Sequence, residues 1–161
     1  MHIVYIDADA CPVKDEIYRV AKRYKLRVIV VANSTMNIPS SPLVEMVVRT
    51  GFGAADDWIA EIVGPGDIVI TADIPLAARS VAKGAYVLDS KGRSLSDANI
   101  GDVLAVRNLH EELRQGGNIR GGPSPMTPKD RSRFLAKLDE TVNAILRKFP
   151  PSAVSSNTSP T

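Results

Sequence analysis

The sequence alternates short apolar runs with segments of helical spacing, and this alternation limits the fold more than any other feature. The runs have the length of buried strands, and the segments between them repeat apolar residues every three or four positions. Strands that alternate with helices are typical of a parallel sheet with helices on both faces. The sequence therefore predicts a doubly wound, three-layer α/β fold with a mostly parallel sheet of about five strands and a C-terminal helical part. The expected strands are residues 3–6, 26–32, 45–49, 67–71 and 85–88, and the expected helices are residues 12–24, 56–63, 75–83, 100–115 and 128–149.

One domain accounts for the chain, because 161 residues fall within the usual domain size of about 100–200 residues. We expect this domain to span residues 1–149 and the uncharged segment 150–161 to be a disordered tail. The single cysteine, Cys11, excludes an intrachain disulfide. No apolar run reaches the about 20 residues that cross a membrane, and Asp7 stands where a signal peptide needs apolar residues. We therefore expect a cytoplasmic protein without a membrane partner. Both a monomer and a homo-oligomer are compatible with the sequence.

Charge is distributed unevenly along the chain. The net charge of +2 is too small to indicate a nucleic-acid-binding protein by itself. Residues 1–106 hold 11 basic and 13 acidic side chains, whereas residues 107–161 hold 9 basic and 5 acidic ones. An acidic first part and a basic last part suit a metal site beside a phosphate-binding surface, although solvated helix faces give the same distribution.

Acidic side chains follow several expected strands at their carboxyl ends. Asp7 and Asp9 follow the first strand. Asp73 follows the fourth, and Asp56 begins the helix after the third. Because the carboxyl ends of parallel strands meet at one edge of a sheet, we expect these carboxylates to lie together. Clustered carboxylates repel one another, and a shared cation relieves that repulsion. Oxygen ligands without histidine favour Mg²⁺ or Mn²⁺ over Zn²⁺, so the sequence predicts a magnesium or manganese site.

Each acidic residue also has a structural explanation. An aspartate that directly follows a strand is often the N-cap of the next helix. Asp89 lies in the turn-like sequence Asp-Ser-Lys-Gly, and Asp67 begins its strand and so belongs to the opposite edge of the sheet. Other residues are expected to be structural: Asp57 in the first turn of a helix, Asp15, Glu16 and Glu61 on solvated helix faces, Cys11 as an unreactive thiol, Trp58 in the core, and His2 and His110 at the surface or in packing.

Four further side chains are candidates for binding a substrate. Asn33 follows the second expected strand and would reach the edge that carries the carboxylates. Lys14, Arg120 and Arg131 are the basic candidates for contacts with substrate phosphates. The segment Gly121-Gly122-Pro123 lacks the lysine and hydroxyl residues of a phosphate-binding P-loop. We interpret it as a turn, and the alternative is that its backbone N–H groups bind an anion near Arg120, Lys129 and Arg131.

Several strings together resemble the YaiI/YqxD family of bacterial proteins, over about residues 2–148. The family is grouped with the PIN-like folds, which are similar to small metal-dependent nuclease domains. The resemblance implies that Asp7, Asp56 and Asp73 hold the metal and that Asp9 is an additional acid. The sequence departs from the family at Gly53, where members often carry an acid, which implies one ligand fewer. The matching strings are Asp7-Ala8-Asp9-Ala10-Cys11-Pro12, Val31-Ala32-Asn33, Ala55-Asp56, Thr71-Ala72-Asp73-Ile74-Pro75-Leu76-Ala77, Gly121-Gly122-Pro123 and Asp130-Arg131.

Three functions are compatible with these residues. The leading hypothesis is a Mg²⁺- or Mn²⁺-dependent nuclease that hydrolyses phosphodiester bonds, with RNA as the expected partner and Asp7, Asp9, Asp56 and Asp73 as the catalytic residues. The second is an RNA-binding module of the same fold without catalysis, which Gly53 and the basic last part favour. The third is a phosphohydrolase of the haloacid dehalogenase type, in which Asp7 attacks phosphorus and Asp9 is the acid and base. Cys11 stands where that class has threonine or valine.

Overall fold

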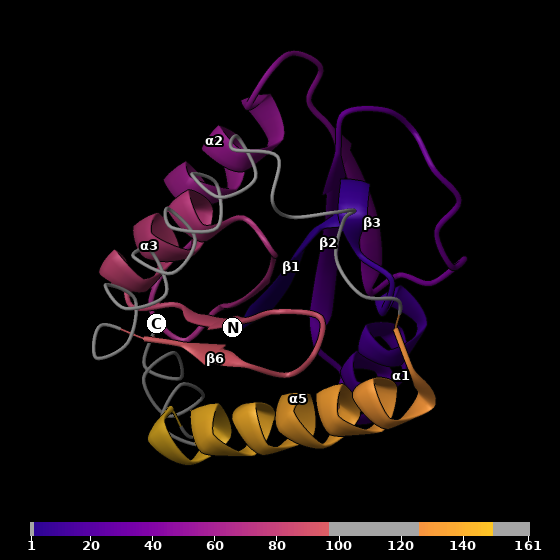
Figure 1. Cartoon of the computed structure of the whole chain (residues 1–161), viewed down its shortest axis with the longest axis vertical. Coiled ribbons are helices and arrows are strands. Elements are labelled where there is room, and N and C mark those ends of the chain that lie inside the picture. Colours follow the sequence, from indigo (N-terminus) through magenta and orange to yellow (C-terminus); the bar gives the residue numbers. More distant parts are fainter. Residues whose placement is uncertain (1, 97–125, 150–161) are drawn as a thin grey trace, which may run out of the picture.

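The computed structural model describes residues 2–96 and 126–149 (Figure 1). A sheet forms its centre, with helices on both sides. The strands are β1 (Ile3–Asp7), β2 (Arg27–Ala32), β3 (Val44–Val48), β4 (Ile68–Ile70), β5 (Tyr86–Leu88) and β6 (Ser94–Leu95). The helices are α1 (Lys14–Tyr24), α2 (Ala54–Ile62), α3 (Ile74–Ala82) and α5 (Pro128–Lys148), and a 3₁₀ turn, η1 (Ala8–Ala10), follows β1.

The sheet has the order β3-β2-β1-β4-β5-β6. Strands β1 to β5 are parallel, and β6 pairs with β5 in the antiparallel direction. The chain builds outward from β1 to β2 and β3, and then crosses to the other side of β1 to form β4. The loops after β1 and β4 therefore leave the sheet on opposite faces, which opens a crevice at the carboxyl ends of these two strands.

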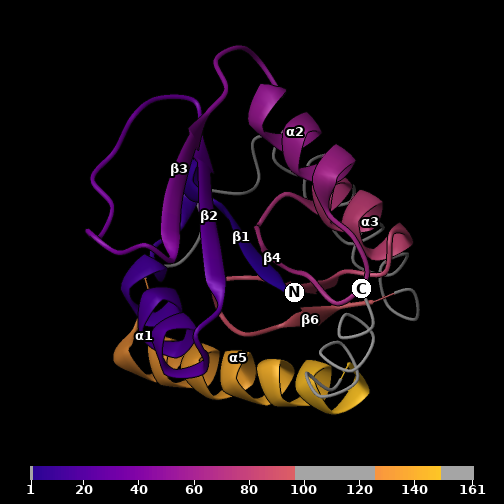
Figure 2. The same ribbon diagram turned by 180° about the vertical axis from the view of Figure 1, so that it is seen from behind.

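Two layers of helices cover the sheet, as Figures 1 and 2 show from opposite sides. Helices α1 and α5 pack on one face, where they contact Val4, Ile6 and Val30. Helices α2 and α3 pack on the other face, against Tyr5 and Ile29. Neighbouring strand residues point to opposite faces and both faces are covered, so the central strands β1, β2 and β4 are mostly apolar and buried. This arrangement confirms the expected three-layer α/β fold with a mostly parallel sheet.

Helix α5 begins as its sequence predicts. Thr127 is the N-cap, its side chain accepts a hydrogen bond from the Asp130 backbone N–H at 3.0 Å, and the Asp130 carboxylate accepts one from the Thr127 N–H at 3.2 Å. This capping box satisfies two N–H groups that have no partner within the helix. The buried stripe of α5 comprises Phe134, Leu138, Thr141, Val142 and Ile145.

Some expected boundaries differ from the structure. Helix α1 begins at Lys14 rather than at Pro12, because η1 continues the chain after β1 and Val13 is the N-cap. The expectation of about five strands missed β6, which has two residues. The expected helix 100–115, His110, Arg120, Gly121-Gly122-Pro123 and the segment 150–161 lie outside the described residues. Within the described part, no helix has both the length and the apolar character needed to cross a membrane.

Candidate functional site

A cavity of about 260 Å³ lies at the carboxyl edge of the sheet, beside the crevice between β1 and β4. The residues around it come from the ends of β1, β2 and β4 and from the start of α2, so segments far apart in the sequence meet here. The structure thus brings all four candidate catalytic carboxylates to one place, together with Asn33. The lining residues are Asp7, Asp9, Asn33, Gly53, Ala55, Asp56, Ala72 and Asp73.

Thr71 connects the two carboxylates that follow β1 and β4. Its hydroxyl donates a hydrogen bond to Oδ2 of Asp7 at 2.7 Å and accepts one from the backbone N–H of Asp73 at 3.0 Å. Thr71 itself is buried. The side chain therefore orients Asp7 and fixes the backbone that carries Asp73. Thr71 is not among the site residues expected from the sequence, although its position two residues before Asp73 was a usable signal.

Asp73 has a structural role at the edge of the cavity. It is the N-cap of α3, and its Oδ1 accepts a hydrogen bond from the Leu76 N–H at 2.8 Å. The expectation that an aspartate after a strand caps a helix is confirmed for this residue. Because a carboxylate has two oxygens, capping leaves the second oxygen of Asp73 for contacts within the cavity.

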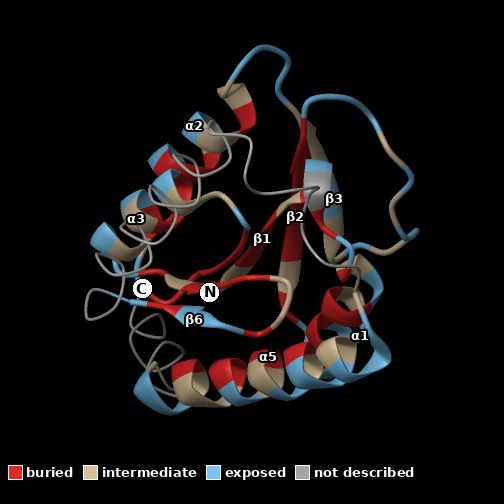
Figure 3. Cartoon of the chain, viewed as in Figure 1, coloured by how far each residue is buried: buried red, intermediate tan, exposed pale blue. Residues whose placement is uncertain are grey.

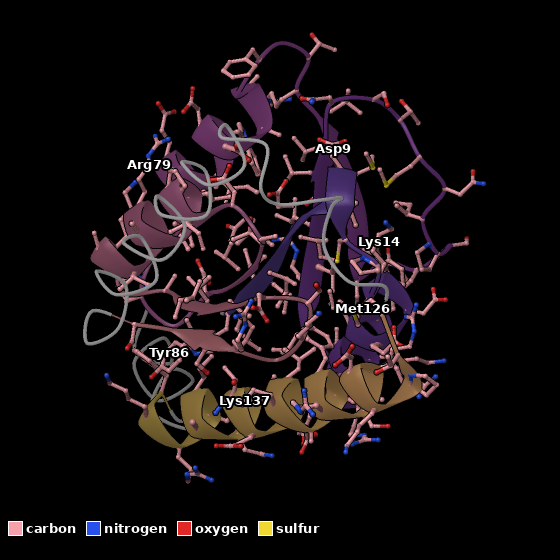
Figure 4. All side chains as sticks on the ribbon, in the orientation of Figure 1. Asp9, Lys14, Arg79, Tyr86, Met126 and Lys137 are labelled. Carbon is pink, nitrogen blue, oxygen red and sulfur yellow. The ribbon has the colours of Figure 1, made fainter. Side chains whose placement is uncertain are left out.

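Asp9 lies on the 3₁₀ turn after β1, and Figure 4 shows it near the ends of the central strands. Both of its carboxylate oxygens accept from the Asn33 backbone N–H, at 3.3 and 3.2 Å. This contact joins the segment after β1 to the end of β2. Asp9 is exposed, so it faces solvent as well as the cavity.

Asp56 lies in the first turn of α2. Gly53 is the N-cap of this helix and has a φ of 71°. Burial raises the pKa of Asp56 to about 6, with further contributions from the charges of Asp7 and Asp73 and from a hydrogen bond with the Asp73 side chain. Burial also raises the pKa of Asp7, and the charges of Asp73 and Asp9 add to this, although the Thr71 hydrogen bond opposes it. The cavity therefore concentrates negative charge that the nearby residues neutralise only in part.

The donor set fits a hard divalent cation in its chemistry. Every ionisable group that lines the cavity is a carboxylate, and oxygen ligands suit Mg²⁺ and Mn²⁺. Burial raises the pKa of the Cys11 thiol, which favours the neutral thiol over the thiolate that binds metals. Among residues 2–96 and 126–149, no three His, Cys, Asp or Glu side chains form a ready-made metal site. One oxygen of Asp7 accepts from Thr71 and one oxygen of Asp73 accepts from Leu76, so each carboxylate keeps its other oxygen as a possible ligand.

Lys14 and Arg131 contact the backbone of the segment after β1 and do not line the cavity. The Lys14 ammonium donates to the carbonyl of Cys11 at 2.9 Å, and Arg131 donates to the carbonyl of Pro12 at 2.8 Å. Arg131 also lies 3.4 Å from Glu16. Glu16 is buried, so the expectation that it is solvated was wrong: the packing of α5 against α1 covers it and supplies its cationic partner.

The structural explanations for several other residues are confirmed. Asp57 lies in the first turn of α2 and pairs with Arg79 at 2.8 Å. Asp67 accepts the N–H groups of Ile3 and Gly64, at the opposite edge of the sheet from the cavity. Asp89 closes its turn by accepting the N–H groups of Lys91 and Arg93. Trp58 packs against the core beside Tyr5, and the ring of His2 contacts Phe149.

Comparison with known proteins shows the family of this chain. The model of the family described as "Uncharacterized BCR, YaiI/YqxD family" matches residues 5–144. The chain belongs to the YaiI/YqxD family. A UPF0178 protein of Rhodopseudomonas palustris (strain HaA2) is 57% identical over 148 residues, which cover 91% of this chain and 90% of the relative. UPF0178 protein bll3966 of Bradyrhizobium diazoefficiens is 50% identical over 157 residues, 97% of this chain and 94% of the relative. No solved structure matches the chain.

Proposed function

We propose that this YaiI/YqxD protein is a Mg²⁺- or Mn²⁺-dependent nuclease that hydrolyses phosphodiester bonds in RNA. The observation that carries the proposal is the cavity where Asp7, Asp9, Asp56 and Asp73 meet at the point at which the strand order reverses. Folding alone does not require these carboxylates to converge, because each costs free energy when it is buried beside another negative charge. The resemblance to PIN-like nucleases supports the same reaction class.

The aspartates divide into ligands and a residue that orients water. Asp7, Asp56 and Asp73 would hold the cation, since all three line the cavity and the charges of Asp7 and Asp73 act on Asp56 in addition to its burial. A bound Mg²⁺ or Mn²⁺ would lower the pKa of a water ligand and stabilise the charge that develops on the phosphate oxygens. Asp9 lies at the exposed side of the cavity, where it would orient the attacking water and accept its proton.

The polar and basic candidate residues divide into those that would contact a substrate phosphate and those that position the segment after β1. Asn33 lines the cavity and is exposed, so its side-chain amide would contact a substrate phosphate. Lys14 and Arg131 hold the carbonyls of Cys11 and Pro12, which supports a positioning role for the segment that carries Asp9. Arg120 stays a candidate for a phosphate contact on the basis of the sequence.

A second candidate is an RNA-binding module that has kept this fold but has no catalytic activity. Gly53 favours it, because the residue lines the cavity but supplies no carboxylate. This module would bind RNA with a steep salt dependence and without a need for metal. In the haloacid dehalogenase alternative Asp7 would attack phosphorus and Asp9 would act as acid and base, and no contact among the described cavity residues favours it over the nuclease.

The test is cleavage of end-labelled single-stranded RNA by the purified protein with Mn²⁺, beside the Asp73→Asn variant. Asparagine is also a good N-cap, so this variant keeps the start of α3 while it loses the charge. The proposal predicts cleavage by the wild type, loss of cleavage in Asp73→Asn, and loss in EDTA. Equal cleavage by both proteins would indicate contamination and contradict it. RNA binding that persists in EDTA without cleavage would favour the binding module, and a phosphoryl group trapped on Asp7 would favour the phosphohydrolase.

A further inference from the structure

Phe52 is a large apolar side chain that the fold leaves entirely in solvent. Its relative exposure is 109%. Figure 3 shows that the loop between β3 and α2, on which it lies, is exposed. Folding normally removes an aromatic ring of this size from water, because its burial is a major source of stability. An aromatic ring left in solvent next to a polar cavity is therefore available for contact with a ligand.

Phe52 directly precedes a residue of the carboxylate cavity. The next residue, Gly53, lines that cavity. Gly51 and Gly53 have φ values of 111° and 71°, which other residues rarely adopt, so the turn depends on both glycines. Their carbonyls accept hydrogen bonds from the N–H groups of Ala54 at 3.2 Å and Asp57 at 2.9 Å. The loop is thus anchored to the start of α2, and the ring stands one residue from the site.

A cation lies on the same loop. Arg49 directly follows β3, and its backbone N–H donates to the Ala32 carbonyl at 2.9 Å, which fixes it at the carboxyl edge of the sheet. Its guanidinium lies 5.4 Å from the centroid of the Trp58 ring and is exposed. Surfaces that bind single-stranded nucleic acid combine exposed aromatic rings for the bases with cations for the phosphates. The loop carries both groups.

We infer that Phe52 is a platform on which a base of single-stranded RNA stacks while the adjoining phosphate enters the carboxylate cavity. This inference rests on the proposed nuclease function and names its substrate form. A base can stack on a protein ring only when it is free of its own neighbours and partner strand, so duplex RNA does not fit this arrangement. Every base has a π-face, so Phe52 would bind RNA with little preference for sequence. Arg49 would bind a neighbouring phosphate of the same strand.

The test is equilibrium binding of a fluorescein-labelled single-stranded RNA with phosphorothioate linkages, in the presence of Mn²⁺. Phe52→Ala and Phe52→Leu should weaken binding about tenfold, whereas Phe52→Tyr, which keeps the ring, should stay within about twofold of the wild type. Ile62→Ala is the matched control, because Ile62 is also apolar and half exposed but lies at the last residue of α2. It should bind as the wild type does. Duplex RNA of the same sequence should bind weakly and equally to all variants.

The outcomes separate this inference from the proposed function. If the wild type binds and cleaves RNA but Phe52→Ala or Phe52→Leu matches it, the stacking role is wrong and the nuclease proposal stands. If the wild type neither binds nor cleaves RNA, both are wrong. Sedimentation provides the remaining check, because a dimer that dissociates in Phe52→Ala would assign the ring to a contact between two copies and overturn the inference.

Discussion

Replacing Asp56 by asparagine should stabilise the protein at neutral pH. Burial and the neighbouring charges of Asp7 and Asp73 raise the pKa of Asp56 from 3.8 to about 6. An acid with a raised pKa holds its proton more tightly in the folded state than in the unfolded state. The stability of the folded state therefore falls as the pH rises from about 4 to about 6, and above this range the whole penalty is present. Asparagine carries no charge and removes the penalty.

The expected size follows from that pKa difference. The difference corresponds to about 3 kcal/mol of unfolding free energy at full strength. Asp56 is only partly buried, and solvent screening reduces the expected gain to about 1–2 kcal/mol. The gain should be complete above pH 7 and should disappear below pH 4, where the wild-type carboxyl is protonated in both states.

Urea unfolding between pH 4 and pH 8 measures this effect, with fluorescence of the single Trp58 as the probe. Asp57→Asn is the matched control, because Asp57 lies in the same turn of α2 but pairs with Arg79 outside the cavity. It should be neutral or slightly destabilising. An Asp56→Asn variant that is no more stable than the wild type at pH 8, or whose gain persists unchanged at pH 4, would refute this explanation.

Three other substitutions test contacts around the site by urea unfolding. Thr71→Val should destabilise the protein by about 1–2 kcal/mol and raise the pKa of Asp7 further, because the hydroxyl that donates to this carboxylate is lost. Thr71→Ser should preserve the stability and the Asp7 pKa, and an Asp7 pKa that NMR finds unchanged in Thr71→Val would contradict the role of this hydrogen bond. Arg131→Met should cost about 1–2 kcal/mol, since it leaves the buried Glu16 without its cation, and a neutral result would show that the pair adds nothing. Phe134→Ala should cost about 3–5 kcal/mol because the ring is fully buried between α5 and the sheet, and a loss below about 1 kcal/mol would contradict the packing of α5.

The strands were predictable because both faces of the sheet are covered. A strand buried on both sides is a continuous apolar run, and β2 and β4 are recognisable from such runs alone. Strand β6 could not be found in this way. It has two residues, and it exists because Ser94 pairs with Leu88 and Leu95 with Val87. Such pairing depends on the tertiary position of β5 rather than on a local pattern.

The convergence of the candidate carboxylates was predictable from the sequence, but their individual contacts were not. Parallel strands place their carboxyl ends at one edge, so the position of Asp7, Asp56 and Asp73 followed from the order of elements. The contacts of the remaining residues did not follow. Arg131 reaches Glu16 across 115 positions of sequence, which no spacing rule anticipates. The hydrogen bond between Thr71 and Asp7 likewise depends on β4 lying beside β1.

Calorimetric titration with Mn²⁺ at pH 7.5 tests most directly whether these aspartates share a divalent ion. The wild type should give a saturating isotherm, Asp7→Asn should give none, and Asp57→Asn should match the wild type. Asparagine at position 7 keeps an oxygen for the Thr71 hydroxyl, so the loss would report the missing charge rather than a disturbed fold. A wild type that binds no Mn²⁺, or an Asp7→Asn variant that binds it equally well, would contradict the account.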